Sequence, residues 1–231
     1  MTDTSPRTAL IIGASRNLGL GLAREFAQRG WKVVGTVRGA SRTGLHDLAD
    51  TSEGQVAVEE VDITVVESVE QLRERFAEAS FDLLFVNAGI TDPDKPASEV
   101  ETEVFTRVMV TNALAPLRVI ETLAPLVKPE GTMGVMSSRQ GSISMNERGG
   151  HEVYRASKSA LNQLMRSYDA RRDDKRTLLL IHPGWVQTEL GGEGAPLTVE
   201  QSVPGIVSTL EAHAGDGGLQ FRSYADETVA W

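Results

Sequence analysis

The segment IIGASRNLGLGLAREF, residues 11–26, decides the fold of this 231-residue chain. A short apolar run ends at Gly13, and from Leu18 onward apolar residues recur at helical spacing. Gly13 and Gly19 bracket the turn between them, where glycine permits a sharp bend and brings backbone amides close to a bound phosphate. Because a helix N-terminus favours negative charge, this strand, turn and helix predict a pyrophosphate-binding loop. A glycine-rich turn without a ligand is the alternative for this stretch alone.

The glycine spacing follows a loose dinucleotide pattern. The stricter form G-x-G-x-x-G fails at Arg24, whereas T-G-x-x-x-G-x-G fits residues 12–19, with Ile12 in place of threonine and Asn17 in place of the second glycine. Asparagine tolerates a positive φ better than other non-glycine residues, so we expect Asn17 to replace that glycine. Ile12 removes a hydroxyl that would tie the loop to its neighbours.

The end of the second predicted strand indicates which dinucleotide binds. An acidic residue there would bond the adenosine ribose and repel a 2'-phosphate. This chain has Thr36, Val37 and Arg38 instead, and Arg16 lies within the loop itself. Since guanidinium groups match phosphate oxygens, we predict NADP(H) rather than NAD(H). Either arginine would otherwise be an ordinary surface residue.

Short apolar runs alternate with amphipathic segments along the rest of the chain. The predicted strands are 9–12, 32–37, 55–58, 83–86, 132–136 and 177–181, and the predicted helices are 18–29, 45–49, 65–79, 99–127, 153–172 and 199–213. Strands so short and uniformly apolar indicate a parallel sheet buried on both faces. We expect an α/β fold, a doubly wound Rossmann-type sheet with helices on both faces, in one domain over 1–231 with a substrate lid near 189–200.

Composition excludes several classes of protein. The formal net charge of -9 argues against a nucleic-acid ligand. With no cysteine, disulfides and thiolate metal sites are excluded, and no His, Asp and Glu cluster has metal-ligand spacing, so no metal is expected. The start MTDTSPRT lacks the apolar core of a signal peptide, and no stretch is long enough to cross a bilayer. We expect a soluble cytoplasmic protein without membrane contact.

Motifs further along the chain resemble those of the short-chain dehydrogenases/reductases. They are Asp62 after the third strand, NAG at 87–89, Asn112, SS at 137–138, Tyr154-x-x-x-Lys158 and HPGWVQT at 182–188, in the order and spacing of that family. Four stretches, SSRQGSI, YRASKSALN, HPGWVQTELGG and LTVEQSVPGIV, look most like the carbonyl-reductase branch that includes Sniffer and the bacterial C-factor proteins. The gap from Ser138 to Tyr154 is longer than usual in the family, which leaves the shape of the substrate pocket open.

This resemblance implies a set of site residues. The implied catalytic tetrad is Asn112, Ser138, Tyr154 and Lys158. The residues expected around the cofactor are Gly13, Ser15, Arg16, Asn17, Leu18, Gly19, Arg38, Asp62, Ile63, Asn87, Ala88, Gly89, Tyr154, Lys158, Pro183, Gly184, Val186 and Thr188. The family also implies a homodimer or homotetramer, for which small residues at Ala156 and Ala160 allow close helix approach.

The residue types at 154 and 158 suit ketone reduction. Such a reaction must deliver a proton to oxygen, and a free tyrosine, with a pKa near 10, holds its proton too tightly for ready exchange at neutral pH. On a helix Lys158 shares a face with Tyr154 and would favour the phenolate by up to about 3 pK units, so that a Tyr154 pKa near neutrality becomes possible. Ser138 would stabilise the developing oxyanion, and Asn112 would link Lys158 to water.

The leading hypothesis is therefore an NADP(H)-dependent reductase of a small or medium carbonyl compound. The alternative is an NADP(H)-binding sensor or signalling protein with little or no turnover. A serine hydrolase is excluded because no G-x-S-x-G elbow surrounds Ser138. We expect the substrate pocket between residues 90–96, 141–153 and 189–196, with Met145, Trp185 and Leu190 as apolar lining. His182 is expected to be structural.

Overall fold

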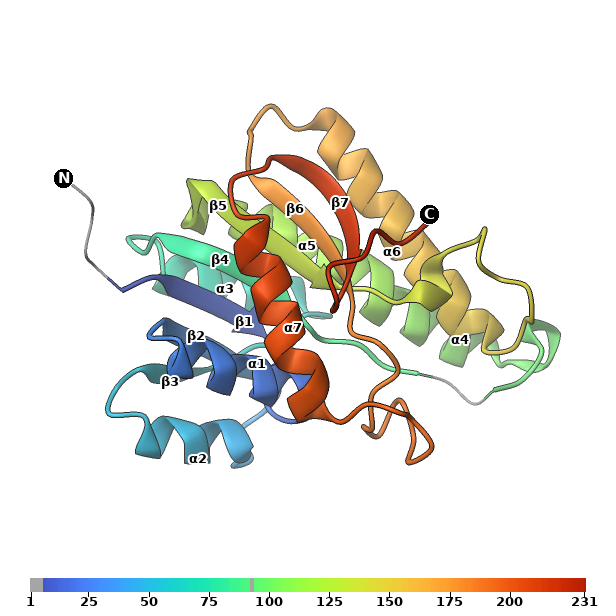
Figure 1. The fold of residues 1–231 in the computed structure, drawn as a ribbon, viewed down its shortest axis with the longest axis horizontal. Coiled ribbons are helices and arrows are strands. Elements are labelled where there is room, and N and C mark those ends of the chain that lie inside the picture. Colours follow the sequence, from blue (N-terminus) through green and yellow to red (C-terminus); the bar gives the residue numbers. More distant parts are fainter. Residues whose placement is uncertain (1–5, 92–93) are drawn as a thin grey trace.

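The computed structural model describes residues 6–91 and 94–231, so two residues of the expected pocket wall 90–96 lie outside it. Seven strands form one sheet in the order β3-β2-β1-β4-β5-β6-β7, and every neighbouring pair is parallel (Figure 1). The strands are β1 Thr8–Ile12, β2 Lys32–Val37, β3 Val56–Glu60, β4 Phe81–Val86, β5 Val127–Met136, β6 Thr177–His182 and β7 Gly218–Ser223. The order reverses between β1 and β4, where ligands bind in sheets of this kind.

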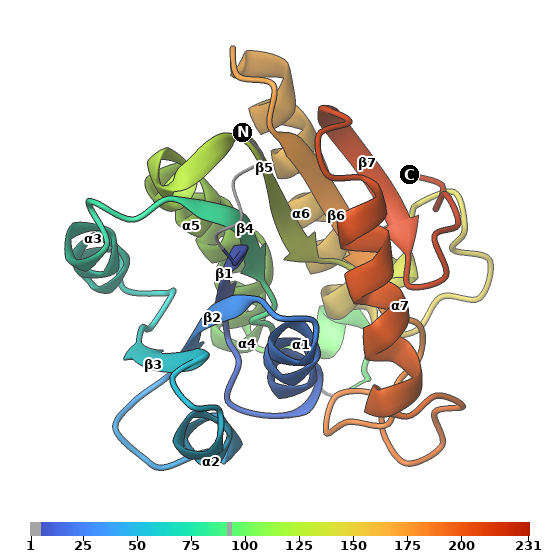
Figure 2. The same ribbon diagram turned by 60° about the vertical axis from the view of Figure 1, so that its left-hand side comes forward.

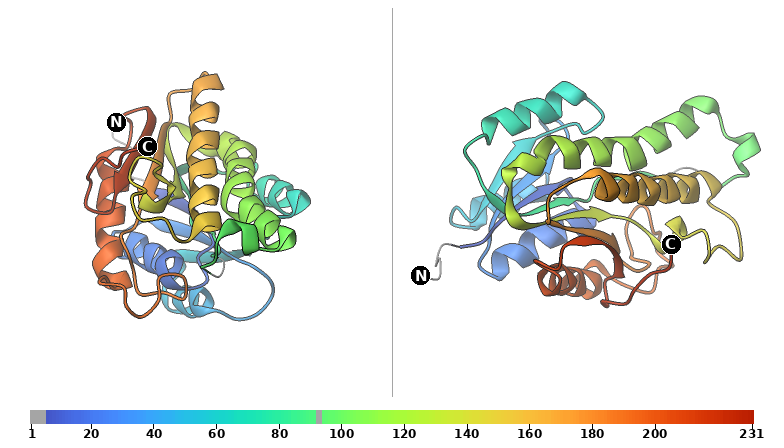
Figure 3. Two further views of the ribbon diagram at one scale, coloured as in Figure 1. Left: turned by 90° about the vertical axis from the view of Figure 1, so that its right-hand side faces the viewer. Right: turned by 90° about the horizontal axis from the view of Figure 1, so that it is seen from above.

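Helices cover both faces of the sheet. The longer ones are α1 Asn17–Gln28, α2 Gly44–Thr51, α3 Val66–Arg75, α4 Thr102–Met109, α5 Ala115–Leu123, α6 Glu152–Arg171 and α7 Val199–Ala212. Side chains of α3, α5 and α6 share one apolar core with the sheet, and those of α1, α2 and α7 share the other. Figures 2 and 3 show the sheet between these two layers. The predicted doubly wound α/β fold is confirmed. In the described part of the chain no helix has the length and apolar character needed to span a membrane.

Several boundaries differ from the sequence prediction, among them β5, which begins at Val127 rather than 132, and α3, which ends at Arg75 rather than 79, and two differences are larger. The predicted helix 99–127 is α4 and α5 joined by a π-helical segment, Val110–Leu114, and it ends at Leu123, where a 3-10 turn containing Pro125 leads into β5. Pro125 has no N–H to donate to the carbonyl four residues back, which favours the end of the helix there. Strand β7 was not predicted: its sequence GLQFRS is not uniformly apolar, and its apolar and polar alternation covers only residues 219–222.

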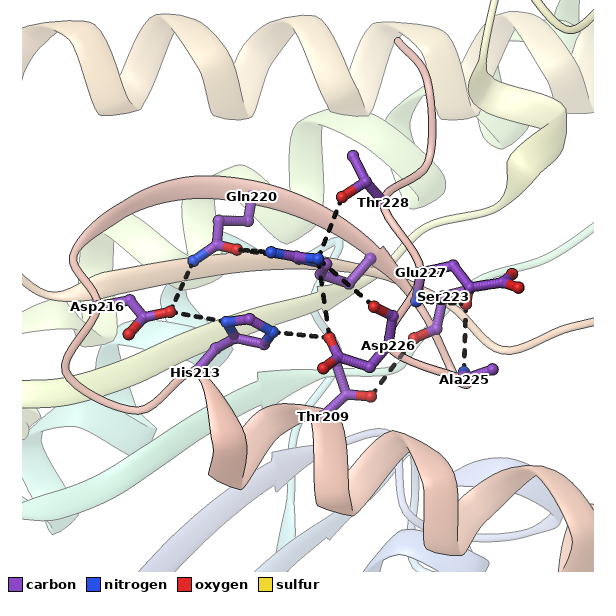
Figure 4. A network of polar contacts seen from close by, with 10 residues as sticks. Thr209, His213, Asp216, Gln220, Ser223, Ala225, Asp226, Glu227 and Thr228 are labelled. Atoms are coloured by element: carbon purple, nitrogen blue, oxygen red, sulfur yellow. Dashed lines mark hydrogen bonds and ion pairs between the residues drawn. The ribbon is translucent and has the colours of Figure 1, made fainter.

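A polar network ties the end of α7 to the turn that follows β7 (Figure 4). His213 bonds Asp216 through Nδ1 and Asp226 through Nε2, both at 2.7 Å. Arg222 Nη1 donates to Thr228 Oγ1 at 3.1 Å across an antiparallel bridge between these two residues. Burial opposes a charge on His213, yet the bonds to the two aspartates outweigh it and raise the pKa of this imidazole. The turn after β7 is thus bonded both to His213 at the end of α7 and to Arg222 on β7.

Candidate active site

The glycine loop has the conformation that its sequence predicts. Gly13 and Asn17 both have positive φ, 85° and 49°, so the expectation for Asn17 is confirmed. Gly13 N donates to Thr36 Oγ1 at 3.0 Å, and Asn87 Nδ2 donates to Gly13 O at 2.9 Å. Gly19 lies against the same carbonyl, because a Cβ at Gly19 would be 2.0 Å from Gly13 O. The loop is therefore fixed by β2 and by the end of β4, and α1 starts directly behind it.

A cleft of about 1330 Å³ opens along the carboxyl ends of the strands, beside the reversal of strand order. This volume exceeds that of a typical drug-sized site and has room for a dinucleotide and a substrate. The cleft is lined by Gly13, Ser15, Arg16, Asn17, Leu18, Arg38, Asp62, Ile63, Asn87, Ala88, Gly89, Ser138, Tyr154, Lys158, Pro183, Gly184, Val186 and Thr188, all of them predicted. Gly19 and Asn112 do not line the cleft, and they lie behind the residues that do.

The end of the cleft nearest β2 fits the adenosine part of a dinucleotide. Arg16 and Arg38 line it, and Ser41 and Thr43, which sequence reasoning missed, lie with them on the wall. Asp62 Oδ1 accepts hydrogen bonds from the main-chain N and the hydroxyl of Thr64, which with the nearby Arg38 hold the pKa of the carboxyl below its usual value. This donor set, two guanidiniums and two hydroxyls, suits a phosphate group.

Tyr154 and Lys158 lie together at the other end of the cleft, on the first two turns of α6. Both are buried, with 8% and 3% of their surface exposed. Lys158 Nζ donates to Met136 O at 2.9 Å and lies 5.8 Å from the centre of the Tyr154 ring. Ser138, at the end of β5, forms a hydrogen bond with the phenol. The predicted juxtaposition of these three residues is present in the fold.

The acidity of the phenol differs from the sequence expectation of a pKa near neutrality. Burial raises the pKa of Tyr154 to about 12, and the bond with Ser138 offsets this only in part. Burial also lowers the pKa of Lys158 to about 8. Lys158 directs its ammonium at the Met136 carbonyl, so the expected attraction does not overcome desolvation. In this structure Tyr154 is a protonated acid at neutral pH.

Asn112 lies behind the cleft rather than in it. It is fully buried in the π-helical segment, a local distortion that is frequent at functional sites. Its Oδ1 accepts from Ile90 N at 2.8 Å, and its Nδ2 donates to Ile90 O at 2.8 Å and to Ser157 Oγ at 3.0 Å. The expected water-mediated link from Asn112 to Lys158 stays a prediction. A Cβ at Gly89 would lie 3.4 Å from Asn112 Oδ1 and 3.5 Å from Lys158 Nζ, so Asn112 fixes the wall beside the lysine.

His182 lines the cleft at the end of β6. Its Nδ1 is buried and has no hydrogen-bond partner among the residues that the structure describes. Burial and the nearby Arg139 lower the pKa of the imidazole to about 4, so it is neutral at pH 7. Its main-chain oxygen accepts from Tyr224 N at 2.8 Å, which joins β6 to the turn after β7. The residue expected to be structural therefore also contacts the site.

The substrate end has the apolar lining that was predicted and one wall that was not. Met145, Trp185 and Leu190 line the cleft with 40%, 59% and 45% of their surface exposed. Ser223, the last residue of β7, lines it as well, together with Tyr224 and Glu227 from the turn that follows. Sequence reasoning missed this wall because it had no strand at β7.

The expected lid near 189–200 is a compact loop that ends before α7. Trp185 Nε1 donates to Gly191 O at 2.7 Å, and Gln187 Nε2 donates to Ala195 O at 2.9 Å. Residues 199–200 belong to the first turn of α7, whose N-cap is Thr198, so the loop is shorter than predicted. Glu189 forms an ion pair with Arg16 at 3.0 Å, which joins the loop to the opposite edge of the cleft.

Comparison with known proteins places the chain in a family. The family described as short chain dehydrogenase matches residues 7–196. A putative short-chain dehydrogenase/reductase from Burkholderia multivorans, solved with bound NADP, is 50% identical with a TM-score of 0.96, over 98% of this chain and 100% of that one. The carbonyl reductase Sniffer of D. melanogaster is 28% identical with a TM-score of 0.84, over 98% and 100%. A curated relative from Rhodococcus sp., 1-hydroxy-2-glutathionyl-2-methyl-3-butene dehydrogenase, is 32% identical over 97% of this chain and 99% of its own.

The chain belongs to the short-chain dehydrogenase family of oxidoreductases. The predicted similarity to the branch that includes Sniffer is confirmed by the structural match.

Proposed function

We propose that this protein reduces a small or medium ketone or aldehyde to the alcohol, using NADP(H), with Tyr154 as the acid and base. The observation that carries the proposal is the buried phenol of Tyr154, hydrogen-bonded to Ser138 in a cleft whose opposite end is the phosphate loop. A proton donor and an oxyanion donor therefore lie in the same cleft as the site expected to hold a dinucleotide.

The cofactor assignment rests on charge at the adenosine end. Arg16 and Arg38 line that end, and the residues ending β2 include no carboxylate that would repel a 2'-phosphate. The Burkholderia protein solved with NADP, half identical to this chain, supports the same assignment.

The bound cofactor would supply the hydride to the carbonyl carbon. Ser138 would donate a hydrogen bond to the carbonyl oxygen, so that negative charge developing there is stabilised. Tyr154 would then transfer its proton to that oxygen. A pKa of about 12 suits this step, because the phenol keeps its proton until the oxygen becomes an alkoxide, a stronger base than the phenolate. The Lys158 ammonium, on the next turn of α6, would stabilise the phenolate that results.

The test follows NADPH consumption by the purified protein against a panel of aldehydes and ketones, with NADH as the comparison cofactor. We expect turnover of at least one carbonyl compound and a lower Kd for NADPH than for NADH. Tight NADPH binding without turnover of any carbonyl would favour the sensor alternative. A clear preference for NADH would contradict the role of Arg16 and Arg38.

We also propose that the protein forms a homodimer or homotetramer through α4, α5 and α6. Phe105 on α4 exposes 39% of its surface, and Ala156 and Ala160 on α6 would allow close approach of a second copy. Light scattering at micromolar concentration should show a mass of at least two chains, and a monomer would contradict this.

A further inference from the structure

Two segments that are far apart in the sequence meet at the substrate end of the cleft. The first, here the substrate loop, is residues 139–150 and carries Met145 on the cleft wall. The second, here the C-terminal hairpin, is residues 218–231. It consists of β7, the turn that bears Tyr224 and Glu227 on the cleft wall, and a tail that folds back along β7, where Val229 N donates to Phe221 O at 2.9 Å.

The tail is hydrogen-bonded to the substrate loop through the main-chain oxygen of Trp231. Trp231 O accepts hydrogen bonds from Ser142 Oγ at 3.1 Å, from Ser144 Oγ at 2.8 Å and from Ser144 N at 3.3 Å. Ser142 is fully buried, and its hydroxyl also accepts from Met145 N at 3.3 Å. The conformation that directs Met145 toward the cleft is therefore bonded, through Ser142, to the end of the hairpin.

The hairpin is itself firmly held. The Trp231 ring packs 5.7 Å from the Phe221 ring on β7 and lies under the guanidinium of Arg166 on α6, 5.8 Å from it. Its turn is fixed to α7 by His213 and Asp226 in the network of Figure 4. The hairpin is thus bonded to α7 and packed against α6 on one side and hydrogen-bonded to the substrate loop on the other, so it connects the two walls.

We propose that the C-terminal hairpin is a positioning element for the substrate loop, with Trp231 and the two serines setting the width of the substrate end and so the affinity for bulky carbonyl compounds. This inference rests on the proposed function, because it assigns the walls of the same site. The loop is pinned at its other side by Gly141, whose carbonyl accepts from Ser159 Oγ at 2.9 Å, so only the part beyond it depends on the hairpin.

The test compares the double variant Ser142→Ala/Ser144→Ala and the variant Trp231→Ala with the wild type. Trp231→Phe keeps an aromatic anchor, and Ser167→Ala removes an exposed hydroxyl on α6 whose hydrogen bonds, within residues 6–91 and 94–231, are to Gln163. With NADPH, the KM for 9,10-phenanthrenequinone should rise about fivefold or more in the first two variants while kcat changes less than about twofold, as expected when binding alone is lost. The KM for acetaldehyde, the NADPH Kd, and both control variants should stay close to wild type.

A second readout does not need turnover. Amide hydrogen exchange of residues 142–147 should speed up about tenfold in the first two variants. In the double-serine variant the Met145 amide loses its acceptor, Ser142 Oγ, and in Trp231→Ala the acceptor of the Ser144 amide, Trp231 O, is no longer anchored by the indole ring. Unchanged exchange would overturn the proposal, as would an unchanged KM for the quinone in a protein that turns it over. If the wild type reduces no carbonyl, the proposed function fails, and exchange alone decides whether the hairpin positions the loop.

Discussion

Replacing Asn112 with alanine tests how the site is held together. Its amide makes three hydrogen bonds, two to the main chain of Ile90 and one to Ser157, at 2.8, 2.8 and 3.0 Å. It is fully buried, so its partners are not exposed to bulk water when the side chain is removed. Asn112→Ala therefore unpairs groups on two segments at once, beside Gly89 and Lys158.

The magnitude follows from the number of bonds. A hydrogen bond contributes about 1 kcal/mol net, so losing three should lower the free energy of unfolding by about 3 kcal/mol. For a chain of this size each kcal/mol lowers Tm by about 2–4 °C, which gives a fall of about 6–12 °C. We also expect a fall in kcat, because the Ile90 segment is no longer fixed against the lysine.

Urea unfolding followed by the fluorescence of the three tryptophans measures this free energy. The matched control is Asn146→Ala, an exposed asparagine whose Oδ1 accepts one bond from Gly149 N, for which we expect a loss below about 1 kcal/mol. If Asn112→Ala were as stable as the control, the inference that this amide fixes the cleft wall would be wrong.

Three further outcomes are expected. Asn17→Ala should lower the free energy of unfolding by about 1 kcal/mol, because φ is 49° at this position, whereas Asn17→Gly should not; equal urea midpoints for the two would contradict the backbone argument. Gly19→Ala should raise the NADPH Kd about tenfold or more, since the new methyl would displace the carbonyl of Gly13, and a fluorescence titration showing the wild-type Kd would refute this. The raised pKa of His213 means that the protonated imidazole stabilises the fold fully below its ordinary pKa of 6.5, and that this stabilisation is lost as the pH rises through the folded pKa. The urea midpoints of the wild type and His213→Gln should therefore converge as the pH rises over that range. A gap that widens with pH would count against the network.

The sequence predicted the glycine loop, most strands and the shared helix face of Tyr154 and Lys158, because each depends mainly on neighbouring residues. The phosphate loop follows from glycine positions and from the tolerance of Asn17 for positive φ. The five inner strands were found because burial on both faces favours apolar residues, and the edge strand β3 was found as well. Tyr154 and Lys158 share a face because they are four residues apart on α6.

The features that were not predicted from the sequence depend on contacts between residues far apart in the chain. Strand β7 lies at the edge of the sheet with Gln220 and Arg222 partly exposed, so its pattern is weak and its pairing with β6 decides its structure. The wall at Tyr224 and Glu227 follows from that pairing. The pKa of Tyr154 is shifted in the direction opposite to the one that the sequence favoured, because desolvation depends on how completely the surrounding chain buries the phenol.

The most direct test of the central claim, that Tyr154 gives its proton to the carbonyl oxygen, is the single-turnover rate of NADPH oxidation by Tyr154→Phe with a carbonyl compound that the wild type reduces. Tyr168→Phe, a buried tyrosine on the same helix that does not line the cleft, is the control. We expect a rate lower by about 10²–10⁴-fold in Tyr154→Phe, an unchanged NADPH Kd and wild-type behaviour in the control. A Tyr154→Phe protein that binds NADPH and oxidises it at the wild-type rate would contradict the account.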